Sequence, residues 1–210
     1  DGSDHNVAVG NYSLRGGTGL LARNIAIGHQ SMGETRQNNI GGIDNVFIGH
    51  QAGGGHWVTA DSSYNIGIGS YALDAALNGA VYNIAIGYGA LSAQTTADSN
   101  VAIGYLAGNS ITTGGSNVLL GHGAGDAINT GYNNTIMGKS AGTNLTTGLN
   151  NVIIGRVAGY TSTDVDKTVI IGEQAAYSGN MTSAADGTVS IGRSEEHTSE
   201  LQSRQYLVCR

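Results

Sequence analysis

Three histidines that recur at one place in a short repeated segment are the first candidates for chemistry. His29, His50 and His122 each follow the glycine that ends a five-residue segment such as NIAIG (24–28). His29 and His50 come from neighbouring copies, so stacked copies would bring their imidazoles close enough to share a metal ion such as Zn²⁺. The other residues found at this place form a mixture typical of a solvated turn, so we expect no bound metal and no other cofactor. They are Asn11, Ser70, Tyr88, Tyr105, Lys139, Arg156 and Glu173.

Acidic residues are the second candidates, because enzymes that cleave polysaccharides need two carboxyl groups at a defined separation. Asp164 and Asp166 are close in sequence, but they alternate with Val165 in a long loop. The other aspartates are scattered, mostly between the repeated segments: Asp44, Asp61, Asp74, Asp98, Asp126 and Asp186. The chain has no GxSxG nucleophile motif, and its glycine-rich GGTG (16–19) lacks the Lys-Ser/Thr of a phosphate loop. We expect no enzymatic activity, with a polysaccharide-depolymerising tailspike as the alternative.

Threonines give a third candidate surface. One row lies four residues before the next repeated segment: Thr96, Thr113, Thr130 and Thr147. A second row lies beside it: Thr95, Thr112, Asn129 and Thr146. Regular threonine rows can order water, so an ice-binding solenoid is a second alternative function. The simpler interpretation is a turn in which the hydroxyls bond nearby backbone.

Two loops between repeats are longer than the rest, at residues 33–44 and 54–64. The second contains His56 and Trp57, the only tryptophan of the chain. A tryptophan on an inserted loop is a reasonable contact for a receptor or a glycan. The alternative is that the loop folds back and buries the indole.

A repeated five-residue segment must position all of these residues, and it occurs eleven times. The copies are NVAVG (6–10), NIAIG (24–28), NVFIG (45–49), NIGIG (65–69), NIAIG (83–87), NVAIG (100–104), NVLLG (117–121), NTIMG (134–138), NVIIG (151–155), TVIIG (168–172) and TVSIG (188–192). Starts of successive copies are mostly 17 residues apart between Asn83 and Thr168, and 18 to 21 apart earlier. Such a period predicts a solenoid whose extra residues form loops on one side.

We number each repeat from its leading Asn or Thr as position zero. Positions one and three are apolar with one exception, Thr135; position four is always Gly and position seven is always small. Valine and isoleucine at one and three predict a strand with one face in a core, and the Gly predicts a turn with positive φ or close backbone contact. The Asn predicts a corner, with side chains that can bond from one repeat to the next.

Position two should face away from the core that holds positions one and three. It is nevertheless mostly apolar, which predicts that this second face packs on other copies of the chain. The residues predicted to pack between chains are Ala26, Phe47, Ala85, Ala102, Leu119, Ile136, Ile153 and Ile170.

Composition narrows the partners. The 210 residues include 35 Gly and no Pro, and 40% are hydrophobic, enough for a core. The net charge of −6 disfavours nucleic acid, whose binding needs clustered Lys and Arg. No run is long and apolar enough to insert into a membrane. We expect the chain to be its own partner.

The tandem segments NIAIGYGAL (83–91) and NVAIGYLAG (100–108) resemble the head repeats of YadA-like trimeric autotransporter adhesins and similar repeats of phage tail fibres. The resemblance covers residues 6–192. It implies an all-β fold, a left-handed parallel β-roll of about eleven turns, with three chains around one axis. It also implies a structural or adhesive segment of an extracellular fibre, on a bacterial surface or a virion, that presents loops to a host receptor or surface glycan. The 17-residue period is longer than the coil of those adhesin heads.

The last residues differ from the rest. Residues 193–210 have no Gly and no repeat, and they contain the only cysteine. RSEEHTSELQS (193–203) resembles a translated sequencing adapter. We expect one repetitive domain, 1–192, and a non-native tail, 193–210. A capping helix is the alternative.

Overall fold

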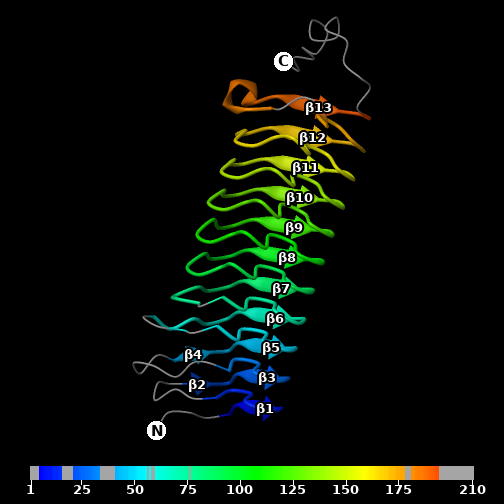
Figure 1. Cartoon of the computed structure of the whole chain (residues 1–210). Coiled ribbons are helices and arrows are strands. Elements are labelled where there is room, and N and C mark those ends of the chain that lie inside the picture. The colour runs from blue at the N-terminus through cyan, green and yellow to red at the C-terminus, as the bar shows by residue number, and fades with distance from the viewer. Residues whose placement is uncertain are drawn as a thin grey trace, which may run out of the picture.

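The computed structural model describes residues 5–15, 21–33, 41–55, 57, 60–75, 77–177 and 181–193. In this part of the chain eleven strands stack in parallel into a rod (Figure 1). They are β1 (Val7–Val9), β3 (Ile25–Ile27), β5 (Val46–Ile48), β6 (Ile66–Ile68), β7 (Ile84–Ile86), β8 (Val101–Ile103), β9 (Val118–Leu120), β10 (Thr135–Met137), β11 (Val152–Ile154), β12 (Val169–Ile171) and β13 (Val189–Ile191). The fold is an all-β parallel β-solenoid, as the repeat predicts. We call each of its turns a rung.

The strands pair in one register along the whole rod. Each position pairs with the same position of the next rung, as Ala85 of β7 does with Ala102 of β8. A second, two-stranded sheet joins β2 (Leu21–Ala22) to β4 (Gly42–Ile43), and a 3₁₀ turn, η1 (Ser183–Ala185), lies before β13. In the described 17-residue rungs only one strand forms per turn, and turns that bond from rung to rung form the rest.

Glycine at position four is required by both conformation and space. Its φ lies between 123° and 141° in every rung, where L side chains are strained. A Cβ on Gly104 would also lie 2.3 Å from the carbonyl oxygen of Gly121 in the next rung. At Gly192, where β13 ends the stack, a Cβ would meet nothing within 4 Å of the described chain.

The leading asparagines form a buried ladder along the rod. The Oδ1 of Asn100 accepts hydrogen bonds from the backbone N–H and from Nδ2 of Asn117, both at 3.0 Å. The Nδ2 of Asn117 also donates to the Gly131 carbonyl at 2.9 Å. The backbone bond recurs from Asn6 to Thr168, so one amide per rung satisfies polar groups that the turn buries. This confirms the expected ladder.

The faces of the strand are the reverse of what we expected. Position two is buried within one chain from β3 to β12. At Gly67 the missing side chain leaves room for the Phe47 ring. Positions one and three are half-buried or exposed in every strand. The prediction that position two packs between chains is therefore wrong for all eight residues. They are Ala26, Phe47, Ala85, Ala102, Leu119, Ile136, Ile153 and Ile170.

The physical reason is that position two has a partner across the rung. The small residue at position seven, such as Ala90 or Ala141, is also fully buried and completes a thin core. Strand alternation then directs positions one and three outward. We call positions one and three the outer face and position two the inner face.

Within the core, the side chains at positions two and eight compensate in size. Most rungs with a large residue at position two have Gly at position eight: Phe47 with Gly53, Leu119 with Gly125, Ile136 with Gly142, and Ile153 with Gly159. Most rungs with Ala or Gly at position two have a large residue instead: Ala26 with Met32, Gly67 with Leu73, and Ala85 with Leu91. The exceptions are Ile170 with Ala176, and Ala102 with Gly108, where Leu91 and Leu119 of the neighbouring rungs fill the space. A Cβ on Gly53 would lie 2.7 Å from Cδ1 of Phe47, so the two positions share one volume.

Candidate functional site

The outer face is an apolar surface that runs along all eleven strands of the solenoid. Thr135 is the one polar residue among its positions, and none is charged. The ends of the face are the most open, with Val9 55% exposed and Ile191 71% exposed, and Ile103 and Met137 are also exposed. Eleven strands about 4.8 Å apart, each three residues of about 3.3 Å long, make a flat face of roughly 500 Å². Apolar patches of this size mark interaction sites.

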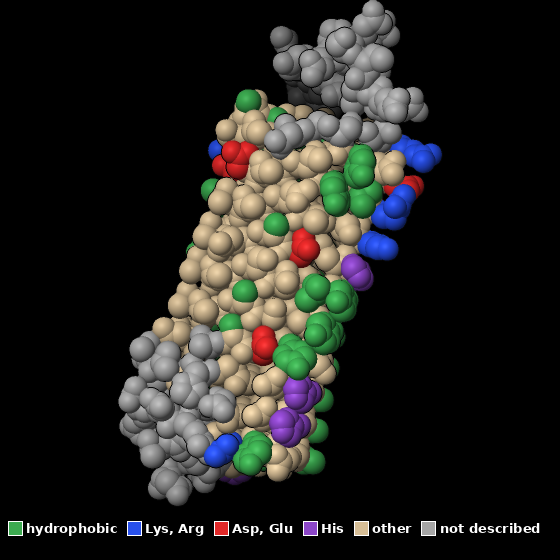
Figure 2. Space-filling view, viewed as in Figure 1, with side chains coloured by type: hydrophobic (Ala, Val, Ile, Leu, Met, Phe, Trp, Pro, Cys, Tyr) green, Lys and Arg blue, Asp and Glu red, His purple; other side chains and the backbone are tan. Residues whose placement is uncertain are grey.

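Beside the outer face, one edge of the rod has a continuous row of aromatic rings. The ring centroids of His29 and His50 lie 5.2 Å apart, and those of Tyr88 and Tyr105 lie 5.4 Å apart. We call the whole row the aromatic ladder. Its members are Tyr12, His29, His50, Tyr71, Tyr88, Tyr105 and His122, with neighbouring centroids 4.9 to 6.2 Å apart. Figure 2 shows histidines and hydrophobic side chains along this edge, with basic side chains further towards β13.

The rings of the ladder come from two positions of the repeat, five and six. Position five supplies most of the rings, but it is Asn11 in the first rung and Ser70 in the fourth. In these two rungs Tyr12 and Tyr71 at position six supply the ring, although each adopts a positive φ, 58° and 61°. Each of the first seven rungs therefore has one aromatic residue at one of the two positions. Position five taken alone predicts a solvated turn, so the ladder was not predicted from the sequence. Positions five and six taken together show one aromatic residue in each of these rungs.

Basic side chains lie at both ends of the ladder. The guanidinium of Arg15 lies over the Tyr12 ring, 4.5 Å from its centroid. After His122, position five is filled by Lys139 and then by Arg156, which pairs with Glu173. Glu173 is the first carboxylate at positions five and six, so the ladder itself has none.

The histidines do not form a metal site in the described part of the chain. No group of three His, Cys, Asp or Glu residues in those ranges could hold a metal ion. His29 and His50 stack with ring planes 7° apart, while three tyrosines separate His122 from them in the ladder. The prediction that these residues belong to a turn stands, with aromatic stacking added.

Trp57 is not a surface contact. It is fully buried, and its ring packs edge-on against Phe47 with centroids 6.1 Å apart. A Cβ on Gly42 would lie 2.8 Å from the indole, so the long loop folds back over the core. This contradicts the receptor role predicted for Trp57. His56, its predicted partner, lies outside the described residues.

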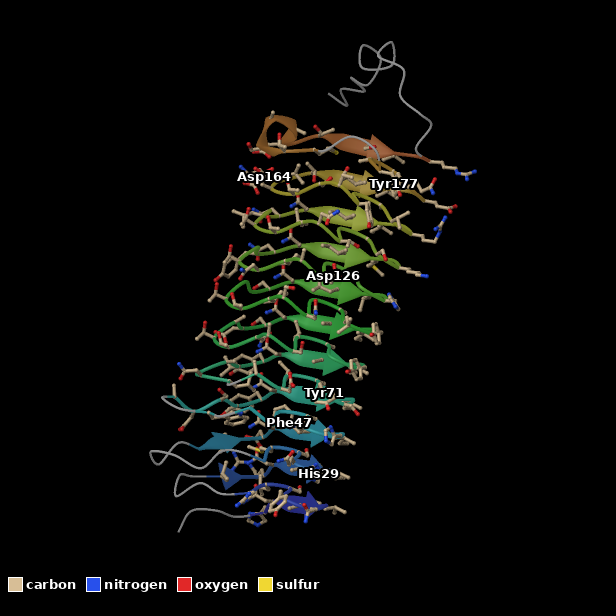
Figure 3. All side chains as sticks on the ribbon, in the orientation of Figure 1. His29, Phe47, Tyr71, Asp126, Asp164 and Tyr177 are labelled. Carbon is tan, nitrogen blue, oxygen red and sulfur yellow. The ribbon has the colours of Figure 1, made fainter. Side chains whose placement is uncertain are left out.

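Most of the aspartates brace loops. Oδ1 of Asp98 accepts the N–H of Val81 at 2.7 Å, and Oδ1 of Asp166 accepts that of Leu149 at 2.7 Å. Asp164 accepts the N–H of Ser183 at 3.1 Å. In Figure 3, Asp164 lies on the opposite side of the rod from His29 and Tyr71. These bonds explain why aspartates recur between rungs.

Two aspartates have less complete partners. Burial raises the pKa of Asp74, opposed by its own backbone N–H. Burial likewise raises the pKa of Asp126, opposed by the backbone N–H groups of Asp126 and Ala127 and by the charge of His122. Oδ1 of Asp126 is buried without a hydrogen-bond partner among the described residues. They lie three rungs apart, so they do not make a pair.

The threonine rows divide by role. Oγ1 of Thr95 donates to the Thr112 carbonyl at 3.2 Å, and Oγ1 of Thr146 donates to the Thr163 carbonyl at 3.0 Å. Thr112 donates to Asn129. The outer row, Thr96, Thr113, Thr130 and Thr147, is exposed. One row thus joins the rungs, although its members Asn129 and Thr146 are also exposed.

No family model, no curated protein and no solved structure matches the chain. The described residues contain no helix long and apolar enough to cross a membrane. The tail expected to be non-native lies outside the described residues, apart from Arg193.

Proposed function

We propose that the chain is a structural and adhesive segment of an extracellular homotrimeric fibre, on a bacterial surface or a virion, that associates through its outer face. The observation that carries the proposal is the run of uncharged positions on all eleven strands, apolar except at Thr135 and at least partly exposed in the single chain. Leaving roughly 500 Å² of flat apolar sheet in water is unfavourable, and association removes it. The number three comes from the resemblance to trimeric adhesin and tail-fibre repeats.

A second copy of the chain is the partner that fits best. The face contains no charge that would select a different protein, and its residues are Val, Ile or Leu in every rung except that of Thr135 and Met137. Parallel chains around one axis would place like rung against like rung, so each strand would meet an equally flat and apolar neighbour. The contact would repeat along the whole rod, which is about 50 Å long for eleven rungs.

The adhesive part of the proposal concerns what the assembled rod presents. With the outer face covered, the turns, the long loops and the aromatic ladder remain available to a host receptor or surface glycan. The role is one of binding rather than catalysis, because the described aspartates brace loops or lie singly.

Light scattering on the full chain tests the association. We expect three times the 21.3 kDa mass of one chain at micromolar concentration. Replacing the outer-face residues Ile86 and Val118 by lysine should reduce the mass to that of one chain and leave the circular dichroism unchanged. Thr113→Lys, on an exposed turn, is the matched control and should stay trimeric. A wild-type chain that is monodisperse and monomeric would contradict the proposal.

A further inference from the structure

We propose that the aromatic ladder binds an extended linear polysaccharide with mostly uncharged sugar rings, which lies along the edge of the rod. This deepens the proposed adhesive function and rests on it. The ladder is an open surface: Tyr12, Tyr88 and Tyr105 are between 47% and 49% exposed in the single chain. Aromatic rings at such exposure are partners for ligands that have apolar faces and polar edges.

The spacing of the ladder fits a polymer rather than a small molecule. Each rung from the first to the seventh contributes one ring, at nearly constant separation. Pyranose units recur along an extended glycan at a comparable separation, so successive sugars can meet successive rings. Tyr88, Tyr105 and His122 are nearly parallel, with ring planes 13° and 23° apart. Because stacked rings cover one another's faces, a chain passing them would meet three ring edges with their hydroxyl and imidazole groups.

The ladder stays continuous where position five lacks a ring. The residue at position six has a positive φ in each of the first seven rungs, whether it is Tyr71, Gln51, Leu106 or Gly89. Tyr71 places an aromatic ring there in the rung whose position five is Ser70, and that ring contacts His50 and Tyr88. The stripe therefore has no gap in its middle.

Charge decides between kinds of polymer. A single-stranded nucleic acid also stacks on aromatic rings, but it needs a cation near each phosphate. The basic groups of this edge lie only at its ends, at Arg15 and beyond His122 at Lys139. Positions five and six between them hold no Lys, Arg, Asp or Glu. The surface therefore suits rings that bind through C–H contacts and hydroxyl hydrogen bonds, with the tyrosine hydroxyls and imidazoles as polar partners.

Affinity electrophoresis of the full chain tests this, in gels that contain hydroxyethyl cellulose, xylan or galactomannan. We expect retardation by at least one of these neutral polymers, and a loss of affinity of at least tenfold in Tyr88→Ser/Tyr105→Ser. Serine is the natural residue at this place in the fourth rung. Unchanged mass and circular dichroism of the variant would show that the ladder acts in binding and not only in stacking.

A second stacked tyrosine pair is the matched control. Tyr64 and Tyr82 lie away from the ladder, are 42% and 58% exposed, and stack with centroids 5.1 Å apart. Tyr64→Ser/Tyr82→Ser should bind as the wild type does. Equal loss in both variants, binding only to alginate or single-stranded DNA, or no binding to any neutral polymer would overturn the inference. A chain that is trimeric but binds no neutral polymer would support the proposed association and overturn the polysaccharide inference. A chain that binds a neutral polymer but is monomeric would support the inference and overturn the association.

Discussion

The two faces of each strand are both apolar, but they vary in different ways. The inner face ranges from Gly67 to Phe47, whereas the outer face is almost uniformly Val, Ile or Leu. On the inner face most residues are matched in volume by position eight, so most of the variation is compensated inside the rung. On the outer face there is no partner within the described chain to compensate for a change. Uniformity indicates a surface that must stay flat, and matched variation indicates a packed interior.

The largest expected effect tests the turn that keeps both faces in register. In Gly104→Ala, the new Cβ would lie 2.3 Å from the Gly121 carbonyl oxygen at a φ of 141°. We expect a loss of about 4 kcal/mol or more in the free energy of unfolding, measured by chemical denaturation. Gly192→Ala is the control, because it has a similar φ of 123° but no atom within 4 Å. The free energy of unfolding of Gly192→Ala should fall by about 1 kcal/mol. Equal losses in the two variants would mean that the strained φ, and not the contact with the next rung, determines the cost.

The next effect compares the two faces directly on β11. Ile153 is fully buried on the inner face, and its neighbour Ile154 is half-buried on the outer face. We expect Ile153→Ala to cost about 3 kcal/mol through the cavity it leaves, and Ile154→Ala to cost under about 1 kcal/mol in the monomer. Chemical denaturation of monomeric protein, with the outer face disrupted by Ile86→Lys and Val118→Lys in both variants, gives the two values. The reverse order would show that the faces are wrongly assigned.

A smaller effect tests compensation within one rung. Ala85 and Leu91 form a small–large pair, whereas Leu119 and Gly125 form a large–small pair two rungs later. Leu91→Gly should cost about 2 to 3 kcal/mol as a cavity, and Ala85→Leu about 1 to 3 kcal/mol by overpacking. Combining them should restore part of the loss, with a coupling of at least about 1 kcal/mol in a double-mutant cycle. Strict additivity would mean that the two positions do not share a volume.

The sequence was sufficient to predict the fold because the repeat has a fixed period of 17 residues from Asn83 to Thr168, where each rung forms the same strand and turns. The Gly at position four and the Asn at position zero indicated the turn and the ladder that the structure contains. The assignment of the faces failed for a physical reason. Strand alternation shows that position two opposes positions one and three, but with both sides apolar it cannot say which side is inside. The volume match between positions two and eight could have decided this.

The candidate site was harder to predict because it depends on contacts between rungs. Trp57 lies on an inserted loop, and only tertiary packing on Phe47 shows that the indole is buried. The aromatic ladder alternates between two positions, so no single column of the repeat reveals it. The ring of Tyr71 at position six contacts His50 and Tyr88 at position five, and these contacts exist only between stacked rungs.

The smallest expected effect concerns a charge on the edge of the core. Burial raises the pKa of Asp126 above its unfolded value, so folding favours the protonated form. Its favourable contribution is present below the unfolded pKa of about 3.9 and is lost as pH rises through the folded pKa. Asp126→Asn should therefore stabilise the protein at pH 7 by about 1 kcal/mol, because it removes a partly buried charge with an unpaired oxygen.

Two controls are available for Asp126→Asn: the equivalent residue of the preceding rung, and a comparison at two pH values. Asn109 occupies the corresponding place in the preceding rung, so an asparagine side chain fits that turn. Thermal melts of variant and wild type at pH 7 and at pH 3 should show an advantage for the variant that disappears at the acid pH. An advantage of the same size at both values would mean that the gain comes from hydrogen bonding of the amide. In that case the carboxylate of Asp126 would be well solvated, and the buried core would end before it reaches this turn.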